Sequence, residues 1–454
     1  MKIVIVGAGK VGVALTRHLA VENRVTVIDQ NPHLVENIIN IYDVMGVCGN
    51  GASYDVQKEA DVEQADLLIA TTSSDEINIL TCLVAKKMGV QHTIARIRSP
   101  EYGRQLRFMR SELGLSMAIN PEAATAREIA RVLRFPTAMK LESFSKGRLE
   151  LVEYRVAEHT ALDGTRLSEL YRNFKVRVLI CAVARQGETI IPSGDFTLRA
   201  GDKIYLTAAP RELEKFFRLL GVFRARASSV MIVGASKMCY YLASELLEMG
   251  MSVKIIDQNE QRCVEMSEKL PRALVIVGDG TDSELLSEEG ISQTDAFVAI
   301  TGLDEANILM ALSAAKQSGD CCKVVAKINR KSLLELVSTE SLIDSVVSTG
   351  AVTTELILQY IRAMKNASAS KVKTLHRIVD EKVEALFSVT PDISFAGVPL
   401  RDLNLKRGLL LAGIVRQNGQ IVIPSGNDVL HLHDDVIVVT TDTQLEDLRD
   451  ILAE

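Results

Sequence analysis

Tryptophan is absent from this 454-residue chain, and aromatic residues make up only 4% of it. The hydrophobic cores must therefore be built mainly from aliphatic side chains, which the 47% hydrophobic content supplies amply. Long apolar runs are also missing. The longest, such as Gly408–Val415, reach about eight residues, whereas a membrane-spanning helix needs about twenty. We therefore expect any role at a membrane to pass through a partner protein.

Cysteine is scarce and shows no pairing pattern. The seven cysteines are an odd number, none forms a Cys-x-x-Cys motif, and the adjacent Cys321 and Cys322 are poorly placed for a disulfide or for metal chelation. This usage indicates reduced thiols in a cytosolic protein. The net charge of -6 gives no reason to expect nucleic-acid binding. The chain starts directly with a strand pattern, Lys2–Val6, so we expect no signal peptide.

The chain contains one pattern twice. Residues 4–31, VIVGAGKVGVALTRHLAVENRVTVIDQN, match residues 231–259, MIVGASKMCYYLASELLEMGMSVKIIDQN, with one inserted residue. The match continues through four further pairs of segments: 49–51 with 278–280, 65–80 with 294–309, 95–97 with 326–328, and 190–194 with 422–426. The chain is therefore a tandem duplication of a unit of about 225 residues.

The first part of each unit alternates short apolar runs with helical patterns. In the first unit, strands are predicted at 2–6, 24–28, 44–48, 67–71, 93–97 and 117–119, with helices near 10–21, 31–41, 53–60, 75–88 and 101–113. Apolar strands alternating with amphipathic helices predict a Rossmann-like, doubly wound α/β domain with a parallel sheet. A helix at Pro121–Leu133 follows, and its counterpart is Val352–Ala367.

The second part of each unit is a smaller α+β domain of about 75 residues. In the first unit it has predicted strands at 149–156, 178–184, 188–191 and 203–207 and a helix at 211–220. The predicted domain limits are 1–138 and 228–368 for the Rossmann-like domains, and 139–223 and 374–454 for the small ones. We expect Arg224–Ser229 to link the halves, and Lys365–Lys373, KNASASKVK, to be a flexible joint.

A Gly-x-Gly-x-x-Gly motif directly follows the first strand and opens a helix. Gly7 allows a tight turn, Gly9 lets the backbone approach a pyrophosphate, and Gly12 permits close packing of helix and strand. The helix N-terminus offers free N–H groups and a positive dipole to phosphates. Asp29 ends the second strand, where a carboxylate accepts hydrogen bonds from ribose and repels a 2′-phosphate. The motif predicts nucleotide binding; the alternative is a fold that keeps only the turn.

The second copy of the motif departs from this pattern. Gly234 and Asp257 are retained, but Ser236 and Cys239 replace the second and third glycines. The Cβ of serine intrudes where a pyrophosphate must lie close, and Cys239 should push the helix away from the sheet. Two interpretations stay open: a second occupied site, or a structural copy whose binding has weakened.

Polar residues follow other strands of the predicted sheet. Asn50 and Asp279 lie in turns after the third strand of each unit, where they either touch the base or simply form the turn. The hydroxyls of Thr71–Ser73 end the fourth strand, so they either meet ribose or phosphate or cap the helix that opens at Asp75.

Two arginines complete the candidate site. Arg96 and Arg98 alternate in the predicted fifth strand, so both should point to one face, toward a phosphate or a neighbouring subunit. Solvated charge is the alternative. The second unit has Lys327 and Asn329 there, followed by Arg330. The predicted ligand contacts are Gly7, Ala8, Gly9, Lys10, Val11, Gly12, Asp29, Asn50, Thr72 and Arg98 in the first unit, and Gly234, Ser236, Asp257 and Asp279 in the second.

Neither metal chemistry nor catalysis is predicted. His431 and His433 lie two apart on a predicted strand, but no third metal ligand accompanies them. An NAD-dependent dehydrogenase would need an acid or base facing the nicotinamide. The small domains offer only the isolated His159 and His376, which have no counterparts in the other copy.

The order of the four domains resembles the TrkA family of Trk-type potassium uptake in bacteria and archaea, built from RCK (also called KTN) domains. The resemblance covers essentially the whole chain. Its most specific features are the VIVGAGKVG start, the GNG and GDG turns, the TSSDEINI and GLDEANI segments, and the repeated IPSG turn.

This resemblance implies a regulatory subunit that is not an enzyme. Members form a ring, generally a homotetramer, at the cytoplasmic face of a dimeric potassium-translocating membrane protein. They bind NAD(H), ATP or ADP, and the resulting change of shape gates the pore. Where residues of this sequence match the positions of the family's motif, the resemblance implies ligand contacts at Gly7, Gly9, Gly12, Asp29 and Asn50. It also implies that Arg98 is an arginine that reaches a phosphate. The alternatives are an NAD-dependent dehydrogenase and a sensor for a different cation transporter.

Overall fold

The structure is a computed structural model with four sheets in two compact units. It describes residues 1–102, 113–134, 140–144, 149–186, 188–222, 227–319, 322–337, 343–369, 372–379, 382–388, 393–406, 408–440 and 448–453. One unit comprises Met1–Ala130 with Ala227–Leu356, and the other comprises Arg131–Arg226 with Ile357–Glu454. One unit therefore contains the Rossmann-like domains of both repeats, and the other contains both small domains.

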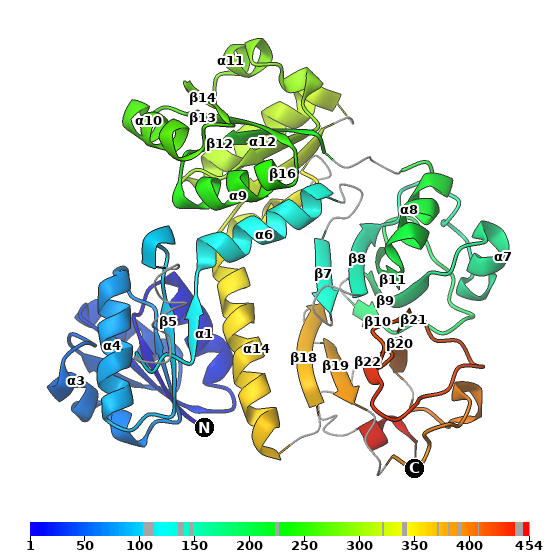
Figure 1. Ribbon diagram of the computed structural model, residues 1–454, viewed down its shortest axis with the longest axis horizontal. Helices are drawn as coiled ribbons and strands as arrows, with labels where there is room; N and C mark the ends of the chain where they lie inside the picture. The colour runs from blue at the N-terminus through cyan, green and yellow to red at the C-terminus, as the bar shows by residue number, and fades with distance from the viewer. Residues whose placement is uncertain are drawn as a thin grey trace. The chain divides into compact units, whose positions relative to one another are not determined.

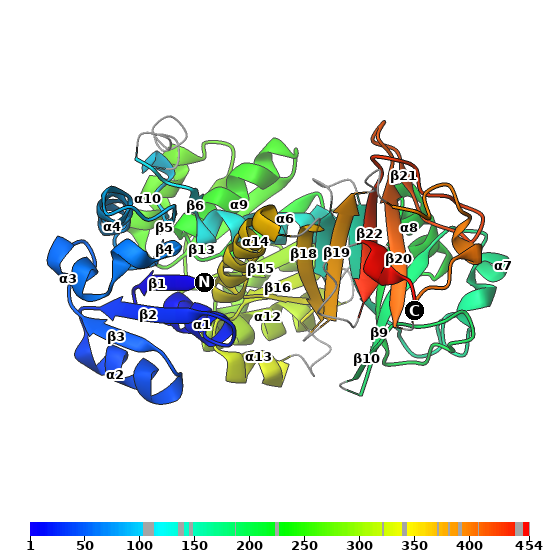
Figure 2. The same cartoon turned by 90° about the horizontal axis from the view of Figure 1, so that it is seen from below.

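The first sheet has the order β3-β2-β1-β4-β5-β6, and every neighbouring pair is parallel (Figure 1 and Figure 2). Its strands are β1 (Lys2–Val6), β2 (Arg24–Asp29), β3 (Met45–Cys48), β4 (Leu67–Ala70), β5 (His92–Arg96) and β6 (Met117–Ile119). Its helices are α1 (Lys10–Leu19), α2 (Pro32–Ile41), α3 (Tyr54–Glu59), α4 (Asp75–Lys87) and α6 (Pro121–Arg134). The strand order reverses at β1, which is where a doubly wound sheet binds its ligand.

Burial explains why these strands lack a polar face. Ile3 and Ile5 are as buried as Val4 and Val6, because helices cover both faces of the sheet. On one face, Val4 and Val6 share a core with Cys82 of α4 and its neighbours. The predicted Rossmann-like fold is confirmed. Most of the predicted helix at 101–113 lies outside the described residues.

The second sheet repeats this topology, with the order β14-β13-β12-β15-β16-β17. Its strands are β12 (Ser229–Val233), β13 (Ser252–Asp257), β14 (Leu274–Val277), β15 (Ala296–Ala299), β16 (Lys323–Lys327) and β17 (Ser345–Val347). Its helices are α9 (Lys237–Glu248), α10 (Glu260–Lys269), α11 (Ser283–Glu288), α12 (Asp304–Ser318), α13 (Lys331–Val337) and α14 (Thr349–Ala369). The tandem duplication read from the sequence is thus also a duplication of topology.

The two small domains also share a strand order. The third sheet runs β10-β9-β11-β8-β7, and the fourth runs β21-β20-β22-β19-β18 (Figure 1). The strands are β7 (Lys140–Phe144), β8 (Leu149–Arg155), β9 (Leu179–Arg185), β10 (Glu188–Ile190) and β11 (Lys203–Ala208), then β18 (Val372–Val379), β19 (Lys382–Ser388), β20 (Leu409–Val415), β21 (Ile421–Val422) and β22 (Asp435–Thr440). In the first domain, α7 (Leu170–Phe174) and α8 (Pro210–Leu219) accompany the sheet.

The third and fourth sheets pack against each other through one apolar cluster. Leu151, Cys181 and Tyr205 of the first small domain share it with Ile437 and Val439 of the second. The opposite face of the third sheet forms its own core with α7 and α8. Each small domain therefore completes its hydrophobic burial with the other copy.

One sequence-based expectation needs correction, and two elements of the first small domain were not predicted. The flexible joint predicted at Lys365–Lys373 is wrong where the structure describes it, because α14 continues to Ala369 and β18 begins at Val372; residues 370 and 371 lie outside the described residues. This stretch includes two alanines, the strongest helix formers, so its composition does not break the helix. β7 and α7 were not predicted from the sequence. No helix within the described ranges combines the length and apolar character needed to cross a membrane.

Candidate nucleotide site

The turn between β1 and α1 depends on two glycines for steric reasons. Gly7 has a φ of +106°, and a Cβ there would lie 2.9 Å from the carbonyl carbon of Thr71. A Cβ on Gly12 would lie 1.8 Å from the carbonyl oxygen of Gly7. The turn therefore brings the start of α1 directly against the end of β1, at the carboxyl edge of the sheet.

Gly9 leaves this turn open to solvent. Nothing lies within 4 Å of the position a Cβ would take at Gly9. Gly9 is also the N-cap of α1 and provides no side-chain hydrogen bond to the helix. The N–H groups of Lys10, Val11 and Gly12 have no acceptor within their own helix, because the first turn of a helix lacks preceding carbonyls. Open space and free donors at a helix N-terminus suit an anionic group.

Asp29 fixes the shape of the turn. Its Oδ2 accepts a hydrogen bond from the Ala8 N–H at 2.6 Å, and its Oδ1 accepts one from the Asn31 N–H at 2.8 Å. A carboxylate oxygen accepts more than one hydrogen bond, so both oxygens keep capacity for ribose hydroxyls. The structure thus brings Asp29 to the glycine turn, while its contact with ribose stays a prediction.

The third strand adds a turn beside this carboxylate. The Gly49 N–H donates to the Asp29 carbonyl at 2.9 Å, and Asn50 Oδ1 accepts from the Ala52 N–H at 3.1 Å. In the second repeat, hydrogen bonds from the N–H and hydroxyl of Thr281 hold the pKa of Asp279 below its usual value. Both side chains therefore stabilise their own turns, and their contact with a base stays a prediction.

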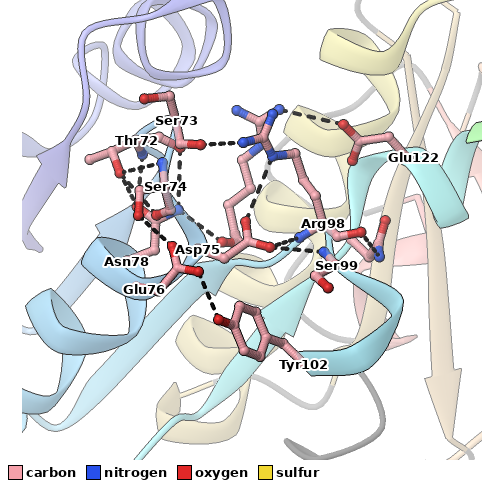
Figure 3. Close-up of polar contacts among 12 residues, drawn as sticks. Thr72, Ser73, Ser74, Asp75, Glu76, Asn78, Arg98, Ser99, Tyr102 and Glu122 are labelled. Carbon is pink, nitrogen blue, oxygen red and sulfur yellow. Dashed lines mark hydrogen bonds and ion pairs between the residues drawn. The ribbon is translucent and has the colours of Figure 1, made fainter. Parts of the chain in front are cut away.

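The hydroxyls of Thr71–Ser73 do not cap α4, although one interpretation of the sequence expected them to. Ser74 is the cap, accepting from the Ile77 N–H at 3.2 Å. Thr72 Oγ1 donates to Asn78 Oδ1 at 2.7 Å (Figure 3). Thr71 is buried, with its hydroxyl against the Val6 carbonyl. The Thr71 N–H donates to the same carbonyl at 2.7 Å. These contacts tie the end of β4 to the end of β1.

Asn78 organises this edge and was missed by the sequence analysis. It is fully buried, and its Oδ1 accepts the Thr72 N–H at 2.8 Å while its Nδ2 donates to the Arg96 carbonyl at 2.8 Å. Asn307 makes the same two bonds to Thr301 and Lys327, each at 2.9 Å. The available signal was the Asp-Glu-x-Asn sequence at the start of the fourth helix in both repeats.

Asp75 is the second buried group that the sequence analysis missed. Its Oδ2 accepts the N–H groups of Arg98 and Ser99 at 2.9 and 2.8 Å. Asp304 accepts those of Asn329 and Arg330 in the second repeat, at 3.0 and 2.8 Å. The carboxylate shapes the chain just beyond the fifth strand of each sheet, which is where the predicted site has its arginine.

Arg96 and Arg98 occupy different positions from those expected. The strand β5 ends at Arg96, so Arg98 lies beyond it and the predicted alternation within one strand is wrong. Arg98 bonds the Ser73 carbonyl through Nη2, and its Nε lies 3.6 Å from Asp75 Oδ1 (Figure 3). Arg96 faces Glu122 at 3.8 Å.

Neither guanidinium is a solvated charge. The side chains of Arg96 and Arg98 are 19% and 29% exposed, and within the described residues neither Nε has a hydrogen-bond partner. Burial lowers the pKa of Arg96, although Glu122 opposes the shift. Burial likewise lowers the pKa of its counterpart Lys327, which Asp304 and Glu122 oppose. Arg96 and Arg98 are therefore two partly buried, weakly paired cations at the carboxyl edge of the sheet.

Tyr241 of the second Rossmann-like domain contacts this edge. The Tyr241 hydroxyl, on α9, donates to the Arg98 carbonyl at 3.1 Å and accepts from Asn120 Nδ2 at 2.8 Å. Asn120 Oδ1 in turn accepts the Ala123 N–H at 2.8 Å in the first turn of α6. The backbone of Arg98 is thus connected to the other repeat.

The second glycine turn keeps the carboxylate contact of the first, but two of its backbone N–H groups have acceptors within the turn. Asp257 Oδ2 accepts the Ala235 N–H at 2.7 Å, as Asp29 does for Ala8. Ser236, however, accepts the Cys239 N–H at 3.3 Å through its Oγ and donates its own N–H to the Gly234 carbonyl at 2.9 Å. Gly234, Ser236 and Asp257 therefore lie together, but the turn is internally bonded.

The histidine pair of the last domain forms a turn. His431 and His433 were expected on a strand, but this prediction is wrong, because both residues precede β22. The His431 N–H donates to Asp434 at 2.8 Å, and His433 takes a φ of 68° where the first copy has Gly201 at 88°. Across the described ranges, no group of three or more His, Cys, Asp or Glu side chains is arranged to hold a metal.

An ion pair beside the corresponding turn recurs in both small domains. Asp202 accepts from Arg185 through two bonds of 2.7 Å, and Asp434 pairs with Arg416. Burial alone would raise the pKa of Asp202, but the hydrogen bonds from Arg185 and the Arg199 N–H outweigh it and lower the pKa. This repeated pair is structural and lies outside the candidate site.

Family models match both parts of each repeat. The TrkA-N domain matches residues 3–121 and 230–349, and the TrkA-C domain matches 151–221 and 385–453. A protein of Archaeoglobus fulgidus, "Trk system potassium uptake protein TrkA homolog", is 31% identical over 452 residues, covering 99% of this chain and 100% of its own. The Vibrio alginolyticus "Trk system potassium uptake protein TrkA" is 32% identical over 448 residues, covering 97% and 94%.

Solved structures share the fold at lower identity. The GsuK RCK domain superposes with a TM-score of 0.63 at 20% identity, covering 98% of this chain and 93% of its own. A GsuK channel bound to NAD gives 0.62 at 21% identity, covering 98% and 77%. Both parts of the repeat therefore have the architecture of RCK domains.

Proposed function

The chain belongs to the TrkA family, and from this premise we propose that it is a regulatory subunit that binds a nucleotide and gates a potassium-translocating membrane protein. The family relationship extends over nearly the whole chain, including both repeats. The observation that carries the ligand is the open turn at Gly9, with its free helix N–H groups beside Asp29. We propose no catalytic step.

The proposed ligands are NAD(H), ATP and ADP. All three carry a pyrophosphate, which suits the free donors at the start of α1, and a ribose, which suits the carboxylate of Asp29. The same carboxylate disfavours the extra 2′-phosphate of NADPH. Structures titled as GsuK bound to NAD and to ADP share this fold, which supports the choice of ligand class.

The proposed partner is a Trk-type potassium-translocating protein at the inner face of the cell membrane. This follows from the relatives' names, which place them in Trk potassium uptake. We propose that the chain reaches the membrane through that partner and self-associates into a ring, as a homotetramer. We also keep the domain limits predicted above, 1–138, 139–223, 228–368 and 374–454, as proposals.

The proposed coupling rests on Arg98. A ligand shifts an equilibrium between two shapes only when its affinity for them differs. ATP carries a third phosphate, which would compete with Asp75 for the Arg98 guanidinium, whereas NADH carries a nicotinamide there instead. Because the Arg98 carbonyl bonds Tyr241, such a movement would be felt by the second repeat. ATP and NADH would then favour different shapes.

Equilibrium binding of ATP, ADP, NADH and NADPH to the full chain tests the proposal. We expect binding of the first three, weak NADPH binding, and loss of all binding with Asp29→Ala. Asp257→Ala is the matched control, because it breaks the same two backbone contacts in the second repeat. Absence of any binding by the wild-type chain, or equal loss in both variants, would overturn the nucleotide assignment.

A second experiment tests the gating role. The chain would be reconstituted with its Trk-type membrane partner in vesicles, and potassium flux measured with ATP and with NADH. We expect the two nucleotides to give different fluxes, and Arg98→Ala to weaken ATP binding more than NADH binding. Identical losses for ATP and NADH would remove Arg98 from the explanation, and nucleotide-independent flux would remove gating.

A further inference from the structure

The two glycine turns differ in how many N–H groups remain for a ligand. In the first repeat, the N–H of Gly9 has no acceptor among the described residues, and those of Lys10, Val11 and Gly12 lie in the first helical turn. The first repeat therefore keeps four adjacent N–H groups available at the start of α1, where Gly9 has open space beside it. Such a cluster matches the several acceptor oxygens of a pyrophosphate.

In the second repeat, two of the four equivalent donors are already used. The Ser236 N–H donates to the Gly234 carbonyl at 2.9 Å, and the Cys239 N–H donates to Ser236 Oγ at 3.3 Å. Only the N–H groups of Lys237 and Met238 remain in the first turn of α9. The serine hydroxyl thus takes a position on the helix N-terminus that an anion's oxygen would otherwise occupy.

The side chain of Ser236 also occupies the space that is open beside Gly9 in the first repeat. Gly9 and Ser236 have similar extended backbones, with φ and ψ of −74° and −173° in one and −102° and 174° in the other. The space beside Gly9 is empty to 4 Å, so a side chain on this backbone projects into it without a clash. The first repeat leaves this space to a ligand, whereas the second fills it with its own side chain.

Cys239 explains why the second turn has a different hydrogen bond. A Cβ at the equivalent Gly12 would lie 1.8 Å from the carbonyl oxygen of Gly7. Cys239 carries such a Cβ and is fully buried, so the Gly234 carbonyl must take another position. It accepts the Ser236 N–H there, and this bond closes the turn on itself.

The second turn is nevertheless an intact structural element. Asp257 holds the Ala235 N–H and the Asn259 N–H as Asp29 holds its two partners. The helix it opens, α9, carries Tyr241, which bonds the Arg98 carbonyl and Asn120. The closed repeat therefore supports the edge of the open one.

We propose that the second repeat is closed by Ser236 and Cys239, so that each chain binds one nucleotide, in the first repeat. This rests on the nucleotide binding proposed above. Losing two charge-assisted donors costs about tenfold in affinity for each, so the second repeat should bind about a hundredfold more weakly than the first.

The stoichiometry of the wild-type chain is the first test. Calorimetric titration with ADP and with NADH, and native mass spectrometry of the full assembly, should give one nucleotide per chain. Two tightly bound nucleotides per chain would overturn the closure while leaving the proposed function intact. No binding at all would instead count against the proposed function, so the two failures are distinguishable.

Opening the second turn is the converse test. The double substitution Ser236→Gly with Cys239→Gly restores the glycine pattern of the first repeat, and a second nucleotide per chain should bind. Because glycine inside a helix destabilises it, Ser236→Gly alone is measured in parallel and should raise affinity at the second site about tenfold. The reciprocal Gly9→Ser with Gly12→Cys should abolish binding. Failure of the folded double variant to gain a site, with Gly9→Ser and Gly12→Cys still binding, would overturn the proposal.

Discussion

Replacing Asn78 by alanine removes the amide that joins the ends of β4 and β5, and Asn307→Ala is a matched control in the other repeat. Asn78 makes three short hydrogen bonds, at 2.8, 2.7 and 2.8 Å, and a longer one of 3.3 Å to the Thr72 carbonyl. At about 1 kcal/mol for each short bond, the local loss is about 3 kcal/mol. Asn307 makes the corresponding bonds at 2.9, 2.7, 2.9 and 3.3 Å, so its loss should be equal.

Amide hydrogen exchange resolved by peptide measures this effect. A local loss of about 3 kcal/mol raises the opening equilibrium roughly a hundredfold. Asn78→Ala should accelerate exchange of the Thr72 N–H and its neighbours, and Asn307→Ala that of Thr301. Only Asn78→Ala should weaken nucleotide binding, because only the first repeat presents an open turn to the ligand.

The control gives the prediction its force. If both variants weaken nucleotide binding equally, the effect is one of general stability and Asn78 has no particular part in shaping the site. If exchange at Thr72 is unchanged in Asn78→Ala, the hydrogen-bond network does not hold this edge. Either result would refute the reasoning from the repeated asparagine.

Three further predictions follow from other contacts. Gly9→Ala should lower the melting temperature by only a few degrees, since its Cβ meets nothing within 4 Å and alanine is a poorer N-cap by about 1 kcal/mol, yet lower nucleotide affinity at least about tenfold in a titration. Tyr241→Phe should accelerate amide exchange around Arg98, whose carbonyl loses a bond worth about 1 kcal/mol; unchanged exchange would contradict this. Asp202→Asn should cost about 3 kcal/mol in a urea titration at pH 7, because it breaks the buried pair with Arg185. Since the pKa of Asp202 is lowered, that stability is present above the unfolded pKa and disappears as the pH falls below about 4, which titration at lower pH would reveal.

Periodicity and duplication predicted the Rossmann-like sheets well. Strands such as β1 and β4 are apolar on both faces and bounded by turns, so burial and local pattern indicate the same element. Comparing the two repeats added information that one copy lacks, since a strand recognised in one supports its counterpart. The small domains were harder to predict: β7 was missed, and β18 begins where a flexible joint was expected.

Only part of the candidate site, the glycine turn with Asp29, could be predicted from the sequence. The glycines and Asp29 follow a spacing that sterics and helix geometry impose on the local chain. Asn78 and Asp75 act instead on backbone groups about twenty residues away, across the end of a neighbouring strand. Such contacts depend on tertiary register, and local pattern cannot reveal them. The end of β5 at Arg96, which leaves Arg98 beyond the strand, also depends on tertiary register.

The back-to-back packing of the two small domains has a consequence for how this chain can evolve. In a dimer of identical subunits, each substitution appears twice, and a change that spoils one turn spoils both. Here both copies belong to one polypeptide, so they meet at a high effective concentration that dilution does not reduce. Covalent linkage also keeps them in equal numbers. Each copy is therefore free to accumulate its own substitutions, and a glycine can be lost from one turn while its partner keeps it.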